Sequence, residues 1–173
     1  MISRAQPDSS DITIGVISDT HGLLRPEAIA ALQGSSFIIH AGDIGKPEVL
    51  SRLEDLAPVI AVRGNNDRGP WATSIPETQF TSVGAHEFLV IHDINQLDLD
   101  ALHTTYTVVI SGHSHKPTIT EQNGILFLNP GSSGPRRFTL PVTMARLNIQ
   151  GPRLSHEIIH LTTSLHTHTS SLT

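Results

Sequence analysis

The chain has 173 residues, 38% of them apolar, which is enough for one domain with a hydrophobic core and too short for two. Its formal net charge of -5 argues against stable binding to nucleic acid, because no basic stripe is present to neutralise phosphates. The absence of cysteine excludes disulfides, thiolate metal sites and a cysteine nucleophile.

The chain begins with a polar segment, residues 1–11, that we expect to be flexible. This segment lacks the apolar core of a signal peptide, and no later run is long enough to span a bilayer. We therefore expect a cytoplasmic protein without membrane contact. Residues 12–161 are predicted to form a single domain, and the Thr/Ser-rich residues 162–173 are predicted to be disordered because they have no apolar face.

Five short apolar runs in this domain each end next to a residue that can bind a metal. Val- and Ile-rich runs of this length are typical of buried strands in an α/β sheet. Such sheets bind their ligands beyond the carboxyl ends of their strands. The runs cover residues 12–18, 37–42, 59–64, 88–91 and 107–112. If these strands are neighbours, the seven polar residues that follow them converge on one rim: Asp19, His21, Asp43, Asn65, His92, His113 and His115.

Segments with helical spacing separate the apolar runs, as a parallel or mixed sheet requires. Residues 25–33 form the first predicted helix, with Pro26 in its first turn. Residues 46–56 form the second, with Pro47 near its start and an apolar stripe along one face. A third and shorter helical pattern covers residues 97–103.

After Lys116 the pattern changes to short strands separated by turn residues. Turns that contain Asn and Gly are typical of antiparallel hairpins. The predicted strands are residues 118–120, 125–128, 142–147 and 154–161. The sequence thus predicts a β-α-β first half and a hairpin-rich second half.

The seven residues at the predicted rim form a mixed set of oxygen and nitrogen donors. This set suits Mn, Zn, Fe, Co or Ni better than Mg or Ca. Seven side chains are too many for one ion with an open position, but they fit two ions if one carboxylate bridges them. Two dications, two Asp and a bridging hydroxide leave one positive charge for the substrate, which suits a phosphate ester.

Five sequence blocks, in their order and spacing, resemble those of the calcineurin-like metallophosphoesterases. The blocks are Asp19-Thr20-His21-Gly22, Gly42-Asp43, Gly64-Asn65-Asn66-Asp67, His92 and Gly112-His113-Ser114-His115. Asn129-Pro130-Gly131-Ser132 and the following Pro135-Arg136 make the chain similar to the small YfcE-like phosphodiesterases. The resemblance implies an α/β fold of four layers, an α/β/β/α sandwich with two mixed sheets face to face.

The resemblance also implies a site for two divalent metal ions. One ion would be bound by Asp19, His21 and His115, and the other by Asn65, His92 and His113, with Asp43 bridging. It implies hydrolysis of a small phosphate ester, foremost a phosphodiester, by a metal-bridging hydroxide. Mn is the expected activator in vitro, with Ni, Fe, Zn or Co as alternatives. The physiological substrate, the native metal and the formation of a homo-oligomer stay open.

Two positions depart from the family pattern. Many relatives carry a His after the metal-binding Asn, where this chain has Asn66, whose amide donates a hydrogen bond but transfers no proton. We assign Asn66 and Asp43 to catalysis and expect esters with leaving groups of low pKa to be cleaved best. After His92, Asp93 and Ile94 replace the usual Gly-His and add a negative charge near the metals.

Several of these residues also have a structural interpretation. A lone Asp or His at a strand end is more often a cap or a satisfied polar group, and only the joint pattern favours a site. We interpret His40 as a hydrogen-bonded core histidine and Asp67 as a residue that orients a neighbouring ligand. Arg63 and Arg68 either contact substrate phosphate or form surface salt bridges.

Two rival functions remain. A protein-binding scaffold like the retromer subunit Vps29 would be marked by lost ligands, whereas all seven are present here. A metal-storage protein would need a closed coordination shell, and this set leaves room for water and substrate on both ions. The Asn129 to Gly134 loop is predicted to support the loop that carries His113 and His115.

Overall fold

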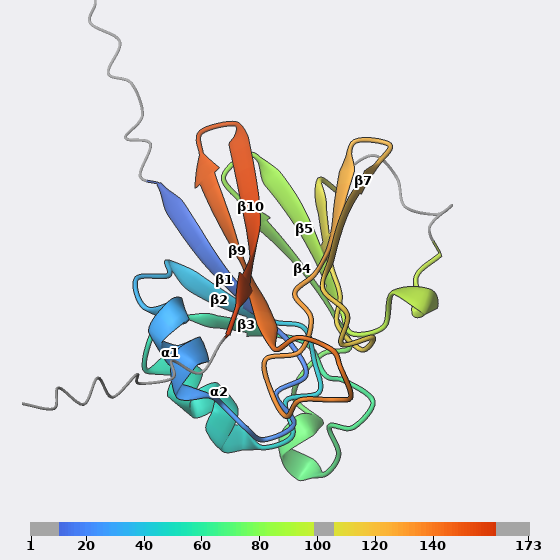
Figure 1. The fold of residues 1–173 in the computed structure, drawn as a ribbon. Coiled ribbons are helices and arrows are strands. Elements are labelled where there is room, and N and C mark those ends of the chain that lie inside the picture. The colour runs from blue at the N-terminus through green and yellow to red at the C-terminus, as the bar shows by residue number, and fades with distance from the viewer. Residues whose placement is uncertain (1–10, 99–105, 162–173) are drawn as a thin grey trace, which may run out of the picture.

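Two five-stranded mixed sheets pack face to face in the computed structural model, which describes residues 11–98 and 106–161 (Figure 1). The first sheet has the strand order β10-β9-β1-β2-β3, and the second has the order β4-β5-β6-β8-β7. The predicted terminal segments, apart from Asp11, lie outside the described residues. The predicted pair of mixed sheets is confirmed.

Both sheets combine parallel and antiparallel strands. The first sheet contains β1 (Ile12–Ile17), β2 (Phe37–His40), β3 (Val59–Ala61), β9 (Thr143–Gln150) and β10 (Arg153–His160). The second contains β4 (Thr78–Val83), β5 (His86–Ile91), β6 (Val108–Ile110), β7 (Thr118–Gln122) and β8 (Ile125–Asn129). Strands β1, β2 and β3 run parallel, and so do β5, β6 and β8. The hairpins β7-β8 and β9-β10 are antiparallel, as the second half of the sequence predicts.

The main hydrophobic core lies between the sheets, and a second core lies under the helices. Successive side chains of a strand point to opposite faces, so Ile14 and Val16 of β1 enter the core between the sheets. Ile17 enters the core shared with the helices. This burial on both faces explains why β1 is a continuous apolar run rather than an alternating one.

Two α-helices, α1 (Pro26–Leu32) and α2 (Pro47–Glu54), contribute to the second core with the first sheet (Figure 1). Both predicted helices are confirmed, and both carry the expected proline in the first turn. Close packing depends on Gly15, because a Cβ there would lie 2.2 Å from Leu32 Cδ2. No helix in residues 11–98 and 106–161 is long and apolar enough to cross a membrane.

Two elements differ from the sequence-based expectations. Strand β4 was not predicted, because Phe80 and Val83 are its only strongly apolar residues and it lies at a sheet edge. The helix expected at residues 97–103 is wrong at Leu97 and Asp98, which are not helical, and its remaining residues lie outside the described ranges. A 3₁₀ turn, η2 (Ile94–Gln96), lies just before it, and a second, η1 (Pro70–Ala72), precedes β4.

Candidate metal centre

All seven predicted ligands lie at one end of the two sheets, in the loops that follow β1, β2, β3, β5 and β6. Contacts of 4.0 Å or less connect every one of them to at least one other. Because both sheets have parallel strands at their centre, the carboxyl ends of strands from the two sheets meet at this end. The predicted convergence is confirmed.

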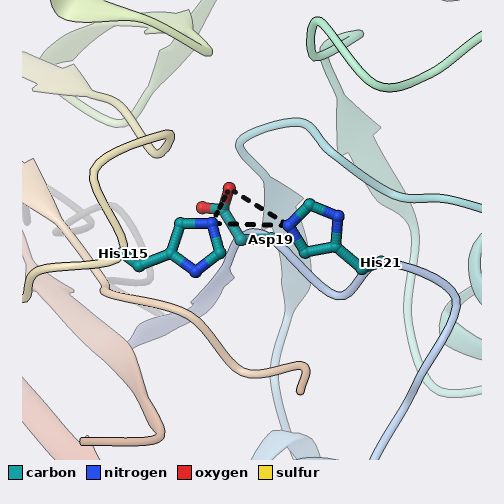
Figure 2. A group of neighbouring side chains, drawn as sticks. All are labelled: Asp19, His21 and His115. Atoms are coloured by element: carbon teal, nitrogen blue, oxygen red, sulfur yellow. Dashed lines mark hydrogen bonds and ion pairs between the residues drawn. The ribbon is translucent and has the colours of Figure 1, made fainter. Parts of the chain in front are cut away.

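We call Asp19, His21 and His115 the first half-site. Figure 2 shows the two imidazole rings approaching the Asp19 carboxylate from opposite sides. Asp19 Oδ1 lies 3.2 Å from His115 Nε2 and 4.0 Å from His21 Nε2, and the two Nε2 atoms are 3.4 Å apart. Asp19 and His115 are buried, and His21 is partly buried. Three donor atoms that face one another at these distances can hold one divalent ion.

Asp43 lies between the first half-site and the residues on its far side. Its Oδ2 is 3.8 Å from His21 Nε2, and its Oδ1 is 3.5 Å from His92 Nε2. Burial alone would raise the pKa of the Asp43 carboxyl. The neighbouring His92 and the hydrogen bonds from Asn66 outweigh burial and hold this pKa below its ordinary value. Asp43 therefore remains a carboxylate with one oxygen available on each side.

We call Asn65, His92 and His113 the second half-site. His92 Nδ1 donates to the carbonyl oxygen of Ala41 at 2.7 Å, which aims Nε2 at Asp43. Burial would lower the pKa of His92, but the Asp43 carboxylate and the Ala41 carbonyl raise it overall. His113 Nδ1 lies 3.1 Å from Asn65 Oδ1. The His113 side chain is 44% exposed, so this half-site is open to solvent.

Asn66 contacts the Asp43 carboxylate with both its backbone and its side chain. The backbone N–H donates to Oδ1 at 2.9 Å, and the side-chain amide donates to Oδ2 at 2.6 Å. The Asn66 amide is therefore committed to holding Asp43. This contact gives the residue an orienting task that the sequence did not predict.

The backbone of the candidate ligands is strained. Seven non-glycine residues in the described ranges have φ in the left-handed region, and five of them are candidate ligands. Their φ values are 55° for Asp19, 46° for His21, 53° for Asp43, 67° for His113 and 59° for His115. Such conformations cost about 1 to 3 kcal/mol each and persist where the surrounding structure enforces them. Strain concentrated in this way is typical of functional sites.

Buried hydrogen bonds fix the loops of the first half-site. Gly42 N donates to His40 Nδ1 at 3.2 Å, so the other ring nitrogen, Nε2, donates to Thr20 Oγ1 at 2.9 Å. Thr20 lies between Asp19 and His21, and its hydroxyl donates to the Ile44 carbonyl. Burial lowers the pKa of His40 to about 4, which keeps the ring neutral. The interpretation of His40 as a hydrogen-bonded core histidine is confirmed.

Asp67 connects two ligand loops through backbone donors. Its carboxylate accepts hydrogen bonds from Gly64 N at 2.9 Å, Ile44 N at 3.1 Å and Gly45 N at 2.8 Å. The backbone of Gly64 packs closely against Asp43, and only glycine permits this, since a Cβ at position 64 would lie 2.2 Å from Asp43 Oδ1. Asp67 thus orients the loop of Asp43 through its backbone and takes no place among the ligands.

The loop after β8 supports the centre from another side, as predicted. Asn129 Nδ2 donates to the Gly112 carbonyl at 2.6 Å and to Ser114 Oγ at 3.1 Å, which holds the loop between His113 and His115. Ser132 Oγ donates to the Asp19 carbonyl at 3.0 Å. This loop therefore fixes residues of both half-sites.

Three charged residues around the centre could not be assigned from the sequence. Arg63 forms an ion pair with Glu77, so the salt-bridge interpretation of Arg63 is the one that the structure supports. Asp93 Oδ2 lies 3.9 Å from His113 Nε2, beside a pocket of about 240 Å³ at the second half-site. Arg137 Nη2 lies 3.3 Å from His21 Nε2. Sequence reasoning missed Arg137, because no spacing rule connects it with His21.

Buried side-chain atoms without a hydrogen-bond partner test whether a metal ion fits this centre. Besides His86 Nε2 and His115 Nδ1, two buried side-chain atoms of the described residues make no hydrogen bond, Asp19 Oδ1 and His92 Nε2. Buried polar atoms are nearly always satisfied, and both of these face other candidate ligands at 3.2 Å and 3.5 Å. A divalent cation at each half-site would satisfy them. The residues therefore fit a metal centre.

Comparison with known proteins agrees with this geometry. The family model of the calcineurin-like phosphoesterase superfamily domain matches residues 12–151. The chain belongs to this family. It is therefore a metal-dependent phosphoester hydrolase. A probable metallophosphoesterase of Methanothermobacter thermautotrophicus is 40% identical over 158 residues, which cover 84% of this chain and 91% of that protein.

Solved structures share the fold. An archaeal phosphodiesterase matches with a TM-score of 0.71 and 26% identity, over 86% of this chain and all of that chain. YfcE, a phosphoesterase from E. coli, matches with a TM-score of 0.65 and 21% identity, over 87% and 100% of the two chains. Vacuolar Protein Sorting 29 (Vps29) of Cryptosporidium parvum has a TM-score of 0.71 and 18% identity, over 88% and 99%. The last two identities are low, so these likenesses show the fold alone.

Proposed function

We propose that the protein hydrolyses phosphodiesters of small molecules at a centre of two divalent metal ions. The observation that carries the proposal is the position of Asp43. Its two carboxylate oxygens face different half-sites, at 3.8 Å from His21 Nε2 and 3.5 Å from His92 Nε2. A carboxylate held in this way is suited to bridge two cations.

The remaining ligands divide between the two ions as follows. The first half-site, Asp19, His21 and His115, would hold one ion, and the second, Asn65, His92 and His113, would hold the other. The mixed oxygen and nitrogen donors suit Mn, with Ni, Fe, Zn or Co as alternatives. Two such ions would supply Lewis acidity and an activated bridging hydroxide for attack on phosphorus.

Asn66 positions the bridging carboxylate in this proposal. Its two hydrogen bonds to Asp43 fix the orientation of both carboxylate oxygens. An amide transfers no proton at ordinary pH, so Asn66 gives the departing alcohol no general acid. Esters whose leaving group needs no proton, such as nitrophenyl diesters, should therefore react faster than alkyl diesters. Equal rates for the two classes would contradict this assignment.

The test is hydrolysis of bis(p-nitrophenyl) phosphate by metal-stripped protein refilled with Mn. We expect turnover that depends on added metal and is abolished in Asp43→Asn. Asp55→Asn is the matched control, because it makes the same chemical change away from the centre. Asp55 is exposed at the end of α2. We expect the control to match the wild type in rate and metal content.

A different outcome would favour a different function. If two ions bind per chain and yet no turnover occurs with Mn, Ni, Co, Zn or Fe, hydrolysis of this diester is excluded. A protein-binding role on the same fold, the alternative inferred from the sequence, would then take first place.

A further inference from the structure

The loop after β8 carries a positive charge into the first half-site. After Gly134 the chain forms an exposed excursion over residues 135–139 and returns to β9. Within this excursion, Arg137 Nη2 lies 3.3 Å from His21 Nε2. His21 Nε2 is one of the donor atoms of the first half-site, so the guanidinium lies at the rim of the metal centre.

The base of this excursion is fixed against the loop that carries the ligands. Ser133 N donates to the Ser18 carbonyl at 3.1 Å, and Arg25 Nε donates to the Gly134 carbonyl at 3.0 Å. A Cβ on Gly134 would lie 2.4 Å from the Asp19 carbonyl oxygen, so only glycine permits this approach. The chain is therefore anchored at Gly134, three residues before Arg137.

The guanidinium of Arg137 has no anionic partner. In residues 11–98 and 106–161 no carboxylate lies within 4.0 Å of it, whereas Arg63 and Arg146 both form ion pairs. Its nearest polar partner is a histidine nitrogen that belongs to the candidate ligands. The guanidinium can only donate, so the acceptor in this contact is the lone pair of His21 Nε2, the same atom that would bind an ion. With an ion bound there, an anion beside the metals would be the guanidinium's favourable partner.

The two ends of the centre also carry opposite charges. Arg137 lies at the first half-site, and the Asp93 carboxylate lies 3.9 Å from His113 Nε2 at the second. A bound phosphate would be attracted by the first end and repelled by the second. Negative charge on a ligand is thus stabilised on the side of His21.

We propose that Arg137 binds a non-bridging oxygen of the substrate phosphate at the first half-site. This inference rests on the proposed function, since it names the residue that recognises the phosphate group. The planar guanidinium presents paired N–H donors that match phosphate oxygens, and such charge-assisted bonds are among the stronger hydrogen bonds in proteins. The ligand class is a phosphate ester or inorganic phosphate, the product of monoester hydrolysis.

The test measures binding of inorganic phosphate to Mn-loaded protein by calorimetry, together with the metal content of each variant. Arg137→Gln should weaken phosphate binding by about 10- to 100-fold, the usual loss for a hydrogen bond between charged groups. Arg137→Lys keeps the charge without the fork and should fall between Gln and the wild type. Arg136→Gln is the matched control, since Arg136 is exposed in the same excursion and, within the described residues, forms no hydrogen bond or ion pair with the centre.

Metal content distinguishes substrate binding from a structural role. We expect Arg137→Gln to keep its full metal content and melting temperature while KM for bis(p-nitrophenyl) phosphate rises more than kcat falls. Loss of metal in Arg137→Gln, or unchanged phosphate affinity, would overturn the proposal.

The binding assay does not depend on turnover, so it separates two failures. If the wild type binds phosphate through Arg137 and hydrolyses nothing, the inference about Arg137 stands and the proposed function fails. If the wild type hydrolyses the diester and Arg137→Gln binds phosphate as well as the wild type, the proposed function stands and the inference fails.

Discussion

The first half-site is held more firmly than the second. Asp19 and His115 are buried, and the loop of Asp19 is fixed by hydrogen bonds from Ser132 and through Thr20 to His40. In the second half-site His92 is equally buried, but Asn65 is exposed and the His113 side chain is 44% exposed. One half of the centre is thus rigid and enclosed, and the other is partly open to solvent.

This difference indicates which of the two ions binds with higher affinity. Donor atoms that are already in place lose little conformational entropy when an ion binds, whereas exposed side chains must be ordered. We therefore expect the first half-site to bind its ion tightly and the second to exchange its ion with solvent. A pocket of about 240 Å³ also lies at the second half-site.

The largest effect on metal binding is expected when one ligand is removed from each half-site. His115→Ala should release both ions, because it removes a ligand of the first ion and frees Asp19, whose carboxylate also lies close to Asp43 and His92. His113→Ala should release only one ion. Metal content after dialysis measures both effects. The loss of metal affinity should exceed the loss of about 100-fold that is typical when a residue hydrogen-bonded to a ligand is removed.

The control for these variants is His156→Ala, since His156 is exposed on β10, far along the chain from every candidate ligand. It should retain the wild-type metal content. The comparison between the half-sites would be wrong if His113→Ala lost both ions and His115→Ala lost one.

Acid should loosen the rigid half through His40. The pKa of this ring is about 4 in the folded protein and 6.5 when unfolded, so the unfolded chain takes up the proton first as the pH falls. His40 therefore contributes stability above pH 6.5 that is lost between pH 6.5 and 4, by about 3 kcal/mol in full. Urea unfolding of metal-free protein at several pH values measures this loss.

His40→Gln removes the titrating group and supplies the comparison. Its free energy of unfolding should depend less steeply on pH than that of the wild type between pH 6.5 and 4. Parallel curves for the two proteins would show that proton uptake at His40 does not limit the stability of this half.

A smaller effect is expected from a substitution next to the second half-site. Asp93 Oδ2 faces His113 Nε2 at 3.9 Å, and Asp93 Oδ1 is occupied by Asn95. A carboxylate behind a ligating histidine typically improves metal affinity, so Asp93→Asn should weaken binding of the second ion by about 10- to 100-fold. Metal titration monitors this, with Glu121→Asn on exposed β7 as control. Weaker binding of both ions alike would contradict the division into halves.

The smallest expected effect concerns Arg63, which lines the pocket of the open half. Its ion pair with Glu77 is solvent-exposed, and such pairs contribute about 1 kcal/mol or less. Arg63→Gln should change the free energy of unfolding by no more than this and leave phosphate affinity unchanged. A loss of phosphate affinity as large as that expected for Arg137→Gln would show that both ends of the centre bind the phosphate.

The arrangement of the ligands could be predicted because each follows an apolar run. Strands β1, β2, β5 and β6 are mostly buried, so their hydrophobic runs are continuous and their ends are visible in the sequence. Strand β3 is half-buried at a sheet edge, but all three of its residues are apolar. Strand β4 was missed because Phe80 and Val83 are its only strongly apolar residues and do not form a run. The sequence shows where apolar residues are continuous, and β4 has no such run.

Contacts between distant loops could not be predicted in the same way. Arg137 and His21 are 116 residues apart, and their approach depends on how the loop after β8 is anchored. The hydrogen bonds of Asn66 to Asp43 depend equally on the turn that follows β3. Residue identity showed which side chains were capable of chemistry. Only the fold shows which of them touch.

The left-handed backbone of five candidate ligands has an evolutionary consequence. At Asp19, His21, Asp43, His113 and His115 the left-handed conformation costs free energy, and glycine would tolerate it better. Selection for catalysis must therefore act continuously against the stability of the fold. A descendant released from that selection would gain stability as it lost these residues, so the same architecture can drift toward an inert and more robust protein.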